Sequence, residues 1–217
     1  MFHAQKPFIV GLAGGSGSGK TTLSKIIATF IPWQTTIVPL DQFYADLTHL
    51  TLEQRKTVNF DDPKSIDMEL AQMVLANLRE GHAAEMPIYD FAVYNRSRKT
   101  QTLSPAPIIL FEGMHTLYHL PLLELYDVTI FLNIDEETRW KRKLERDIAE
   151  RGRTYQDVLQ MWQRYTKPMH DVYVQPSFTR ADLVFTDTFA PRVIEVITNE
   201  IRHRVHMKHN VTGEMPE

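Results

Sequence analysis

Five short, apolar-rich runs recur along the chain, separated by longer stretches in which apolar and polar residues mix. A run of strand length with few polar positions is typical of a strand that is buried on both faces, as in a parallel sheet. The pattern predicts strands over 8–13, 35–40, 107–113, 128–132 and 181–185.

Helical patterns occupy most intervals between these strands. We expect helices over 21–30, 52–58, 66–79, about 135–151, 154–165 and 191–205. Spacing within the 66–79 helix predicts a buried face made of Ile66, Leu70, Met73, Val74 and Asn77. Strands that alternate with helices predict an α/β fold with a doubly wound, mainly parallel sheet and right-handed crossovers.

The pattern changes between residues 86 and 104. Two strand-like segments, 86–94 and 99–103, flank the polar segment 95–98, which predicts a β-hairpin insertion outside the main sheet. We expect a single domain over 1–217, with the hairpin at about 86–104, a helical lid at about 139–166 and a polar tail at about 207–217.

Composition narrows the class of protein. Hydrophobic residues make up 43% and charged residues 24% of the 217 positions, which suits one globular α/β domain with a full core. The absence of cysteine excludes disulfides, thiol catalysis and cysteine–metal sites, and a net charge of -3 offers no basic field for nucleic acid. No apolar run is long enough to span a bilayer, and residues 1–7 lack the apolar core of a signal peptide. We therefore expect a cytoplasmic enzyme that binds neither nucleic acid nor a membrane.

The segment directly after the first strand fits the phosphate-loop pattern G-x-x-x-x-G-K-[ST]. Its glycines let backbone N–H groups point at phosphate oxygens, and the following helix directs its positive end at the anion. Lys20 supplies a charge for the outer phosphates and Thr21 a hydroxyl for Mg²⁺. A plain Gly/Ser-rich turn is the alternative, but such turns rarely carry Lys-Thr-Thr at this offset. The segment therefore predicts a P-loop nucleotide site made of Gly14, Gly15, Ser16, Gly17, Ser18, Gly19, Lys20, Thr21 and Thr22.

Two carboxylates follow predicted strands at the edge of the sheet where the phosphate loop lies. Asp41 comes just after the 35–40 strand and Glu112 ends the 107–113 strand. Mg²⁺ takes a few protein oxygens together with phosphates and waters, so Thr21, Asp41 and Glu112 suffice as its protein ligands. A helix cap for Asp41 and a buried ion pair for Glu112 are the alternatives, and the phosphate loop favours the metal site.

Basic and aromatic side chains suggest the rest of a site. Arg142, Arg146 and Arg153 lie where a lid over the phosphates would form, although most charge runs are only solvated faces. Several aromatic residues flank polar turns, which suits the walls of a pocket for a planar or sugar ligand: Phe43, Tyr44, Phe60, Tyr89, Phe91 and Tyr94. Three histidines without ligand-like spacing receive no role: His115, His119 and His170.

Six segments follow one another along the chain: the phosphate loop, 41–44 (DQFY), 59–63 (NFDDP), 87–91 (PIYDF), 111–113 (FEG) and 146–153 (RDIAERGR). In this order they resemble the phosphoribulokinase/uridine kinase family of P-loop kinases, and within it the uridine–cytidine kinases. Many NTPases share the phosphate loop, but the ordered set, which spans about 8–185, is specific to this family.

The resemblance implies transfer of the γ-phosphate of ATP, with Mg²⁺, to a sugar hydroxyl. In a uridine or cytidine kinase of pyrimidine salvage that group is the 5′-hydroxyl of a pyrimidine nucleoside. The family pattern implies that Asp41 is the base beside this hydroxyl and also lies near Mg²⁺, while Thr21 and Glu112 complete the metal site.

The remaining roles follow from the same resemblance. Asp61 would hold the ribose hydroxyls, and Tyr44 and Tyr89 would shape the sugar and base pocket. The lid would act through cations: Arg142, Arg146 and Arg151 on the phosphates, with Lys143 and Arg153 reaching toward the acceptor. Lys20 and Arg146 would stabilise the transferring phosphoryl group.

Departures from the family pattern fall on the residues that read the base. Tyr94 stands in place of a histidine, Lys143 in place of a second lid arginine, and Met161 in place of a glutamine. A buried site that lacks its polar reader loses discrimination for the substrate. A same-family kinase for a sugar, a phosphosugar or a vitamin-like alcohol therefore stays open, as do ATP or GTP as donor, feedback regulation and a homo-oligomer.

A nucleotide-dependent switch is a further alternative from a different class. A GTPase switch needs an N/T-K-x-D motif, and the nearest segment, 166–169 (TKPM), lacks the aspartate. The sequence therefore favours a kinase with a small-molecule acceptor.

Overall fold

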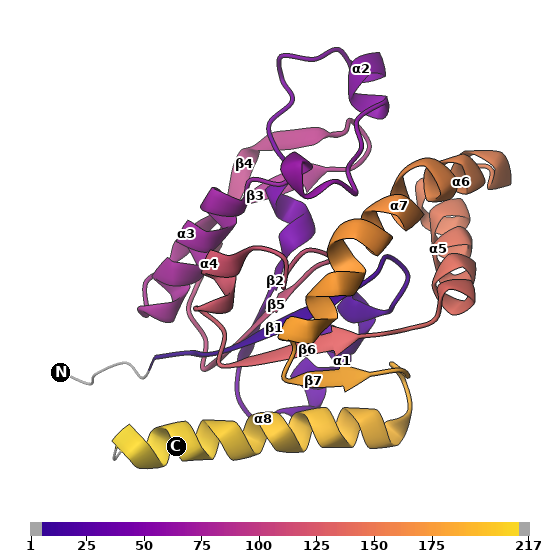
Figure 1. Cartoon of the computed structure of the whole chain (residues 1–217). Helices are drawn as coiled ribbons and strands as arrows, with labels where there is room; N and C mark the ends of the chain where they lie inside the picture. Colours follow the sequence, from indigo (N-terminus) through magenta and orange to yellow (C-terminus); the bar gives the residue numbers. More distant parts are fainter. Residues whose placement is uncertain (1–5, 213–217) are drawn as a thin grey trace.

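A five-stranded parallel sheet forms the centre of the molecule in a computed structural model that describes residues 6–212 (Figure 1). The strand order is β2-β5-β1-β6-β7, and all neighbouring pairs are parallel. The strands are β1 (Phe8–Gly14), β2 (Thr35–Pro39), β5 (Ile108–Glu112), β6 (Val128–Leu132) and β7 (Leu183–Phe185). The predicted α/β fold with a parallel sheet is confirmed.

The apolar runs are continuous because both faces of the sheet are covered. In β1, Ile9 joins a core cluster on one face with helix α3 (Met68–Arg79), while Val10 joins a second cluster on the other face. That second face is covered by α1 (Lys20–Phe30) and α8 (Pro191–Thr212). Polar residues at alternate positions of β1 would therefore be buried on one side or the other.

The register of the sheet brings three loops to one edge. Glu112, the last residue of β5, is paired with Leu12 of β1 on one side and Pro39 of β2 on the other. The phosphate loop after β1 and the 3₁₀ turn η1 (Leu40–Phe43) after β2 therefore begin beside Glu112. Ligands of open α/β sheets bind at this carboxyl edge, where crossovers lead to opposite sides of the first strand.

Helix α3 differs from its predicted register. Asp67 caps the helix by accepting a hydrogen bond from the Leu70 N–H, so the helix begins at Met68. Met73, expected in the core, is 56% exposed. The buried face consists of Met68, Ala71, Val74, Leu75 and Leu78. The predicted stripe was rotated around the helix from this face, and only Val74 belongs to both.

The hairpin forms, but its turn lies earlier than predicted. Strand β3 (Ala84–Asp90) pairs antiparallel with β4 (Asn95–Leu103), and residues 91–94 make the turn. The polar residues expected in the turn begin β4. Asn95 anchors that start, since its amide accepts the Leu47 N–H at 2.7 Å and donates to the Thr48 hydroxyl at 3.0 Å.

A long helical arm leaves the sheet after β6 and returns to it before β7, and Figure 1 shows it projecting beside the carboxyl edge. It consists of α5 (Glu136–Arg151), α6 (Tyr155–Met161), a π-helical turn η3 (Trp162–Thr166), α7 (Lys167–Met169), a second π-helical turn η4 (His170–Val174) and a 3₁₀ turn η5 (Gln175–Arg180). As predicted, Asp135 caps α5 through the Thr138 N–H. The helix expected to end near residue 165 continues to Arg180.

Short elements complete the chain, and α8 is longer than predicted. The short elements are α2 (Leu52–Lys56), η2 (Pro63–Ser65) and α4 (Leu120–Leu123). Helix α8 reaches Thr212, so the first part of the expected tail is helical and residues 213–217 lie outside the described residues. No helix of residues 6–212 combines the length and apolar character that a bilayer crossing requires.

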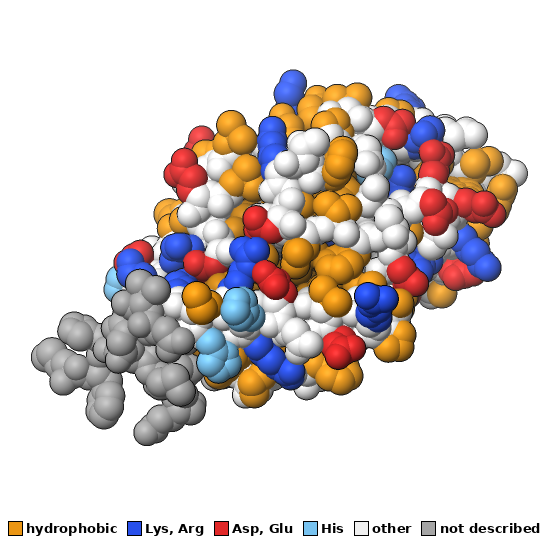
Figure 2. All heavy atoms as spheres, turned by 60° about the horizontal axis from the view of Figure 1, so that its bottom comes forward, with side chains coloured by type: hydrophobic (Ala, Val, Ile, Leu, Met, Phe, Trp, Pro, Cys, Tyr) orange, Lys and Arg blue, Asp and Glu red, His pale blue; other side chains and the backbone are white. Residues whose placement is uncertain are grey.

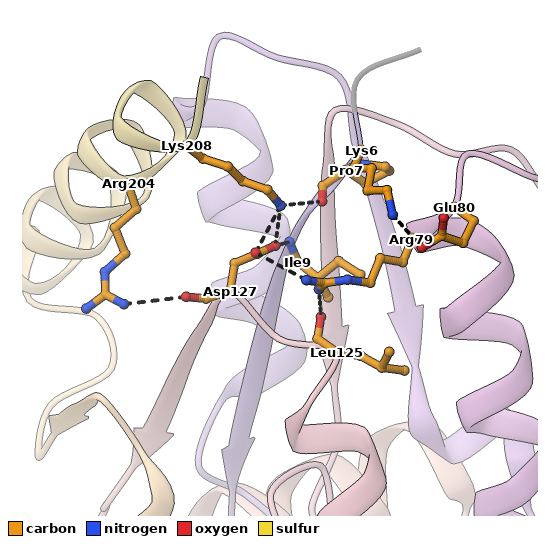
Figure 3. A network of polar contacts seen from close by, with 9 residues as sticks. All are labelled: Lys6, Pro7, Ile9, Arg79, Glu80, Leu125, Asp127, Arg204 and Lys208. Carbon is orange, nitrogen blue, oxygen red and sulfur yellow. Dashed lines mark hydrogen bonds and ion pairs between the residues drawn. The ribbon is translucent and has the colours of Figure 1, made fainter. Parts of the chain in front are cut away.

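The opposite edge of the sheet is held by Asp127, the residue just before β6 (Figure 3). Its carboxylate accepts the Ile9 N–H at 2.7 Å and the Lys208 ammonium at 2.9 and 3.0 Å, and Arg79 lies 3.7 Å away. One carboxylate thus ties β1, α3 and α8 together, far from the site edge. On the face drawn in Figure 2, Lys and Arg side chains are interspersed with Asp and Glu, so this face offers no continuous basic surface.

Candidate active site

A cavity of about 1630 Å³ opens at the carboxyl edge of the sheet. The phosphate loop, η1, the hairpin turn and the helical arm all contribute to its walls. It brings together Lys20, Thr21, Asp41, Tyr44, Asp61, Tyr89, Tyr94, Glu112, Arg142, Lys143, Arg146, Arg151 and Arg153. All the predicted site residues outside the phosphate loop except Phe43 therefore line one cavity.

Backbone geometry explains the glycines of the phosphate loop. Gly17 and Gly19 have φ angles of 80° and 91°, in the left-handed region that favours glycine. At Gly17 a Cβ would also lie 2.2 Å from the Arg139 carbonyl oxygen. The loop is therefore pressed against α5. Ser16, Gly17, Gly19 and Thr22 line the cavity, whereas Ser18 is buried beneath it, with Gly14 and Gly15 outside the lining.

Lys20 lies across the loop from which it comes. Its ammonium donates to the carbonyls of Gly14 at 2.8 Å and Gly15 at 3.1 Å. Burial lowers the pKa of Lys20, and the negative charges of Glu112 and Asp41 oppose that shift. The ammonium thus lies between the loop and two carboxylates, where it can bind an outer phosphate.

The predicted magnesium ligands lie together. The Thr21 hydroxyl donates to Glu112 Oε1 at 2.8 Å. Glu112 is 4% exposed, and burial raises the pKa of its carboxyl group. In residues 6–212 there is no group of three or more His, Asp or Glu residues placed to hold a metal. One hydroxyl and two carboxylates fit Mg²⁺, which takes its other ligands from phosphate and water.

A buried aspartate organises the basic residues of the arm. Asp147 is fully buried, and its Oδ2 accepts hydrogen bonds from Lys143 and Arg153, each at 2.8 Å. Oδ1 accepts from Arg146 Nη2 at 2.8 Å, and Arg151 lies 3.6 Å away. Although burial alone opposes ionisation, Lys143 and Arg146 hold the pKa of Asp147 far below its usual range. One negative and four positive groups leave a net positive wall on the cavity.

The end of α5 directs the last two arginines back onto the same aspartate. The N–H groups of Gly152 and Arg153 both donate to the Asp147 carbonyl, with Gly152 at φ 63°. This turn is the left-handed helix ending that glycine favours. Asp147 was not among the predicted site residues. The signal in the sequence was the spacing of Asp147 from Lys143 at i−4 and Arg151 at i+4 on one predicted helix.

Aromatic rings form the wall opposite the arm. The ring centroids of Tyr44 and Tyr89 are 5.0 Å apart, and Tyr94 stacks on Phe60 at 6.0 Å. Tyr94, at the end of the hairpin turn, has φ 52°, the only positive φ of a non-glycine residue in 6–212. Phe43 does not belong to this wall, because it is fully buried against Phe111, and the prediction that it lines the pocket was wrong.

Three side chains support the site from outside the cavity lining: those of His115, Thr166 and Arg139. None of them was given a role in the site from the sequence. His115 bonds the Asp61 carbonyl at 2.8 Å, and the Thr166 hydroxyl donates to the Asp61 carboxylate at 2.7 Å. Arg139 is buried beneath Gly15, where a Cβ would lie 2.7 Å from its Nη1. Their roles depend on contacts between distant segments, which no local pattern reveals.

His170 packs beside Arg139 under the phosphate loop. Its Nδ1 would lie 2.9 Å from a Gly15 Cβ, and its Nε2 lies 3.1 Å from the Gln175 amide oxygen. Burial lowers the pKa of His170 to about 4, and the Arg139 charge adds to the shift. A neutral imidazole therefore supports the loop from below. Phe189 supports its other side, with the Arg142 guanidinium 4.9 Å from the ring centroid.

Sequence comparison agrees with the motifs. The family described as "Phosphoribulokinase / Uridine kinase family" matches residues 9–193. A uridine kinase of Macrococcus caseolyticus is 36% identical over 93% of this chain and 99% of its own length. A uridine kinase of Clostridium tetani is 34% identical over 93% of this chain and 98% of its own.

Structural comparison shows the same fold. Phosphoribulokinase from Rhodobacter spheroides superimposes with a TM-score of 0.63 at 18% identity, over 87% of this chain and 74% of that one. A D-glycerate 3-kinase from Cryptococcus neoformans superimposes with a TM-score of 0.60 at 19% identity, over 82% of each chain.

Proposed function

This chain belongs to the phosphoribulokinase/uridine kinase family and is a kinase; we propose that it transfers the γ-phosphate of ATP to the 5′-hydroxyl of a pyrimidine nucleoside. The observation that carries this proposal is the continuity of one cavity. Its lining includes the phosphate loop, both candidate metal carboxylates, Asp61 and the aromatic wall. A donor phosphate and an acceptor with a flat ring can therefore occupy it at the same time.

The proposed reaction assigns the chemistry to three groups. Asp41 accepts or orients the proton of the acceptor hydroxyl as the new O–P bond forms and the bond to the β–γ bridging oxygen breaks. Lys20 and Arg146 stabilise the charge of the transferring phosphoryl group. Thr21, Asp41 and Glu112 are the residues that would hold Mg²⁺, which neutralises phosphate charge when bound.

The arm supplies the proposed lid. Its cations line the cavity as a preformed set around Asp147, so little reorganisation is needed to receive phosphates. Arg142 and Arg151 face the donor side in this proposal. A lid that closes over the reacting groups excludes water, which would otherwise hydrolyse ATP.

Two residues on the acceptor side of the cavity, Lys143 and Tyr94, support a second candidate function. Lys143 is 4% exposed and bonded to Asp147, and Tyr94 is stacked on Phe60. Both positions differ from the residues that the family uses to read a pyrimidine. These contacts favour a same-family kinase for a sugar or another hydroxylated compound as the second candidate.

A coupled assay of ATP consumption with Mg²⁺ tests the proposal against uridine, cytidine, purine nucleosides, sugars and phosphosugars. We expect turnover that depends on a pyrimidine nucleoside. Turnover with a sugar and silence with every nucleoside would favour the second candidate. ATP hydrolysis at one rate with every compound would contradict both and favour a nucleotide-dependent switch.

A further inference from the structure

We propose that Thr166 is a positioning residue for the acceptor, because its hydroxyl fixes the carboxylate of Asp61 and leaves one oxygen for the hydroxyl of the bound compound. The inference rests on the proposed function, in which Asp61 binds acceptor hydroxyls. It adds a determinant of acceptor choice from the helical arm.

Asp61 is held at three points. Its N–H donates to the Asn59 side chain at 3.1 Å, and its carbonyl lies 2.8 Å from His115 Nε2. A carbonyl can only accept, so His115 carries a proton on Nε2. The third contact is the bond of 2.7 Å from the Thr166 hydroxyl to Asp61 Oδ2. Within residues 6–212, no side chain or N–H group donates to Oδ1, which remains for a ligand.

Thr166 makes an unusual contact for a helical threonine. A hydroxyl inside a helix usually bonds a carbonyl of the preceding turn. Thr166 is fully buried and instead donates to a side chain 105 residues away in sequence. It closes the π-helical turn Trp162–Thr166, a rare geometry that occurs often at functional sites. The turn directs this hydroxyl at Asp61 rather than at its own helix.

The neighbouring residue strengthens the same junction. The Tyr165 hydroxyl donates to the Thr57 carbonyl at 3.3 Å, so two successive residues of the arm reach the loop that carries Asp61. The arm also carries the cations around Asp147, and Lys143 and Asp61 line the same cavity. The acceptor carboxylate is therefore positioned by the element that carries the predicted lid.

The physical consequence concerns orientation. A carboxylate held on a loop can rotate, and a hydrogen bond from a buried hydroxyl selects one orientation. If Thr166 is lost, Asp61 still carries its charge but no longer presents Oδ1 in a fixed direction. Acceptor binding should weaken while the phosphate loop and ATP binding stay intact.

The test compares Thr166→Val with Thr166→Ser and with the matched control Thr129→Val. Thr129 is also a buried threonine, and its hydroxyl lies 3.0 Å from the Asp182 carboxylate in a part of the sheet outside the cavity. We expect Thr166→Val to raise the acceptor KM about 10-fold with little change in the ATP KM, which is the loss of one hydrogen bond to a charged group. Thr166→Ser should restore the wild-type value, and Thr129→Val should leave it unchanged.

A cycle with modified acceptors separates positioning from mere structural support. Uridine is compared with 2′-deoxyuridine and 3′-deoxyuridine, and the hydroxyl whose loss costs most in the wild type is taken as the partner of Asp61. If Thr166 positions Asp61, that cost in kcat/KM should shrink from about 10-fold to about 3-fold or less in Thr166→Val, because coupled groups are not additive. An equal cost in both proteins would overturn the proposal.

A measurement without ligand keeps this inference distinguishable from the proposed function. Hydrogen exchange of the peptide segment 57–66 should be faster in Thr166→Val than in wild type, with the segment around Thr129 unchanged. If wild type phosphorylates no nucleoside, the proposed function fails, and the same cycle is run with the sugar that turns over and its deoxy analogue. Unchanged exchange in 57–66 together with an unchanged acceptor KM would sink the inference whichever acceptor is used.

Discussion

At the scale of single residues, the site depends on carboxylates with different surroundings. Asp41 lines the cavity in the turn after β2, while Glu112 is almost entirely buried at the end of β5. An acid that receives or orients a proton must reach the acceptor, whereas a metal ligand can lie deeper. Burial therefore favours different tasks for two acids that the sequence places at equivalent strand ends.

Asp41→Asn tests the first task, which is to receive or orient the proton of the acceptor hydroxyl. The amide keeps the shape but cannot accept the acceptor proton, so we expect kcat to fall by about 100-fold or more, as for loss of a general base. ATP binding, followed by calorimetry, should change little. Asp46→Asn, at an exposed residue outside the cavity, serves as control and should keep kcat. Near-normal turnover of the Asp41 variant would remove Asp41 as the base.

Glu112→Gln tests the second task, that of a metal ligand. Burial raises the pKa of Glu112, so its contribution to stability is present below the unfolded-state value and is lost as pH rises. At pH 8 the glutamine variant should therefore unfold at an equal or higher temperature than wild type when both lack nucleotide. Stabilisation by ATP with Mg²⁺ should largely disappear, because a carboxylate ligand is missing. Glu80→Gln, an exposed change, should retain it, and full retention by the Glu112 variant would argue against a metal role.

At the scale of elements, helix α5 combines many basic residues with one buried acid. Its basic residues would repel each other, and the fully buried Asp147 forms ion pairs with three of them and with Arg153 just beyond the helix. Asp147 also takes part in the C-terminal end of the helix, because the N–H groups of Gly152 and Arg153 donate to its backbone carbonyl.

The variant Asp147→Asn tests whether the charge of this aspartate stabilises the buried cations around it. Lys143, which is 4% exposed, would lose its buried partner, and we expect the free energy of unfolding to fall by about 3 kcal/mol. The double variant Asp147→Asn, Lys143→Met should regain much of that stability in urea denaturation, because it removes the uncompensated ammonium.

The activity of these two variants should not follow their stability. In both, kcat should remain low, because Arg146 and Arg153 have lost the carboxylate that orders them. Asp157→Asn, at the exposed N3 position of the capping box of α6, should change the free energy of unfolding little and spare kcat. Recovery of kcat together with stability in the double variant would show that Asp147 only balances charge.

At the scale of the whole molecule, the phosphate loop depends on support from segments far along the chain. Arg139 and His170 lie under Gly15, and Phe189 packs against Gly19. These contacts connect the loop to α5, to the π-helical turn η4 and to the segment before α8. Unfolding of the molecule should therefore respond to the state of groups beneath the loop.

His170 gives a measurable pH dependence of this kind. Its pKa of about 4 lies below the usual unfolded value of about 6.5, so its contribution to stability is present above pH 6.5 and is lost as pH falls toward 4. Between pH 7 and pH 5, His170 should lower the free energy of unfolding by about 2 kcal/mol. His170→Gln should remove that part of the slope in urea denaturation, whereas His82→Gln, at an exposed residue, should keep it. An unchanged slope in the His170 variant would contradict a buried neutral ring.

Much of the architecture was predictable from sequence because its signals are local. Apolar runs marked all five strands of the main sheet, and the glycines with Lys20 and Thr21 marked the phosphate loop. Parallel strands present their carboxyl ends at one edge, so Asp41 and Glu112 could be expected near that loop. The α3 face, the hairpin turn and the helical course of 166–180 were missed. Helix α3 carries apolar residues on more than one face, the polar residues 95–98 begin strand β4, and π-helical turns shift a periodic pattern.

The sequence by itself thus determined the fold class, the phosphate loop and the acids that end the strands, because neighbouring residues and a regular sheet are enough to place them. Tertiary structure alone decided that Asp147 is buried and that Thr166 and His115 hold Asp61. The cations around Asp147 lie within six residues of it, and α5 with its C-terminal turn brings them together. Tertiary structure also decided that His170 and Arg139 lie beneath Gly15. Those contacts join segments 50 or more residues apart, or depend on burial. The energy of a buried polar group depends on the partner that folding brings to it, and the linear chain does not specify that partner locally.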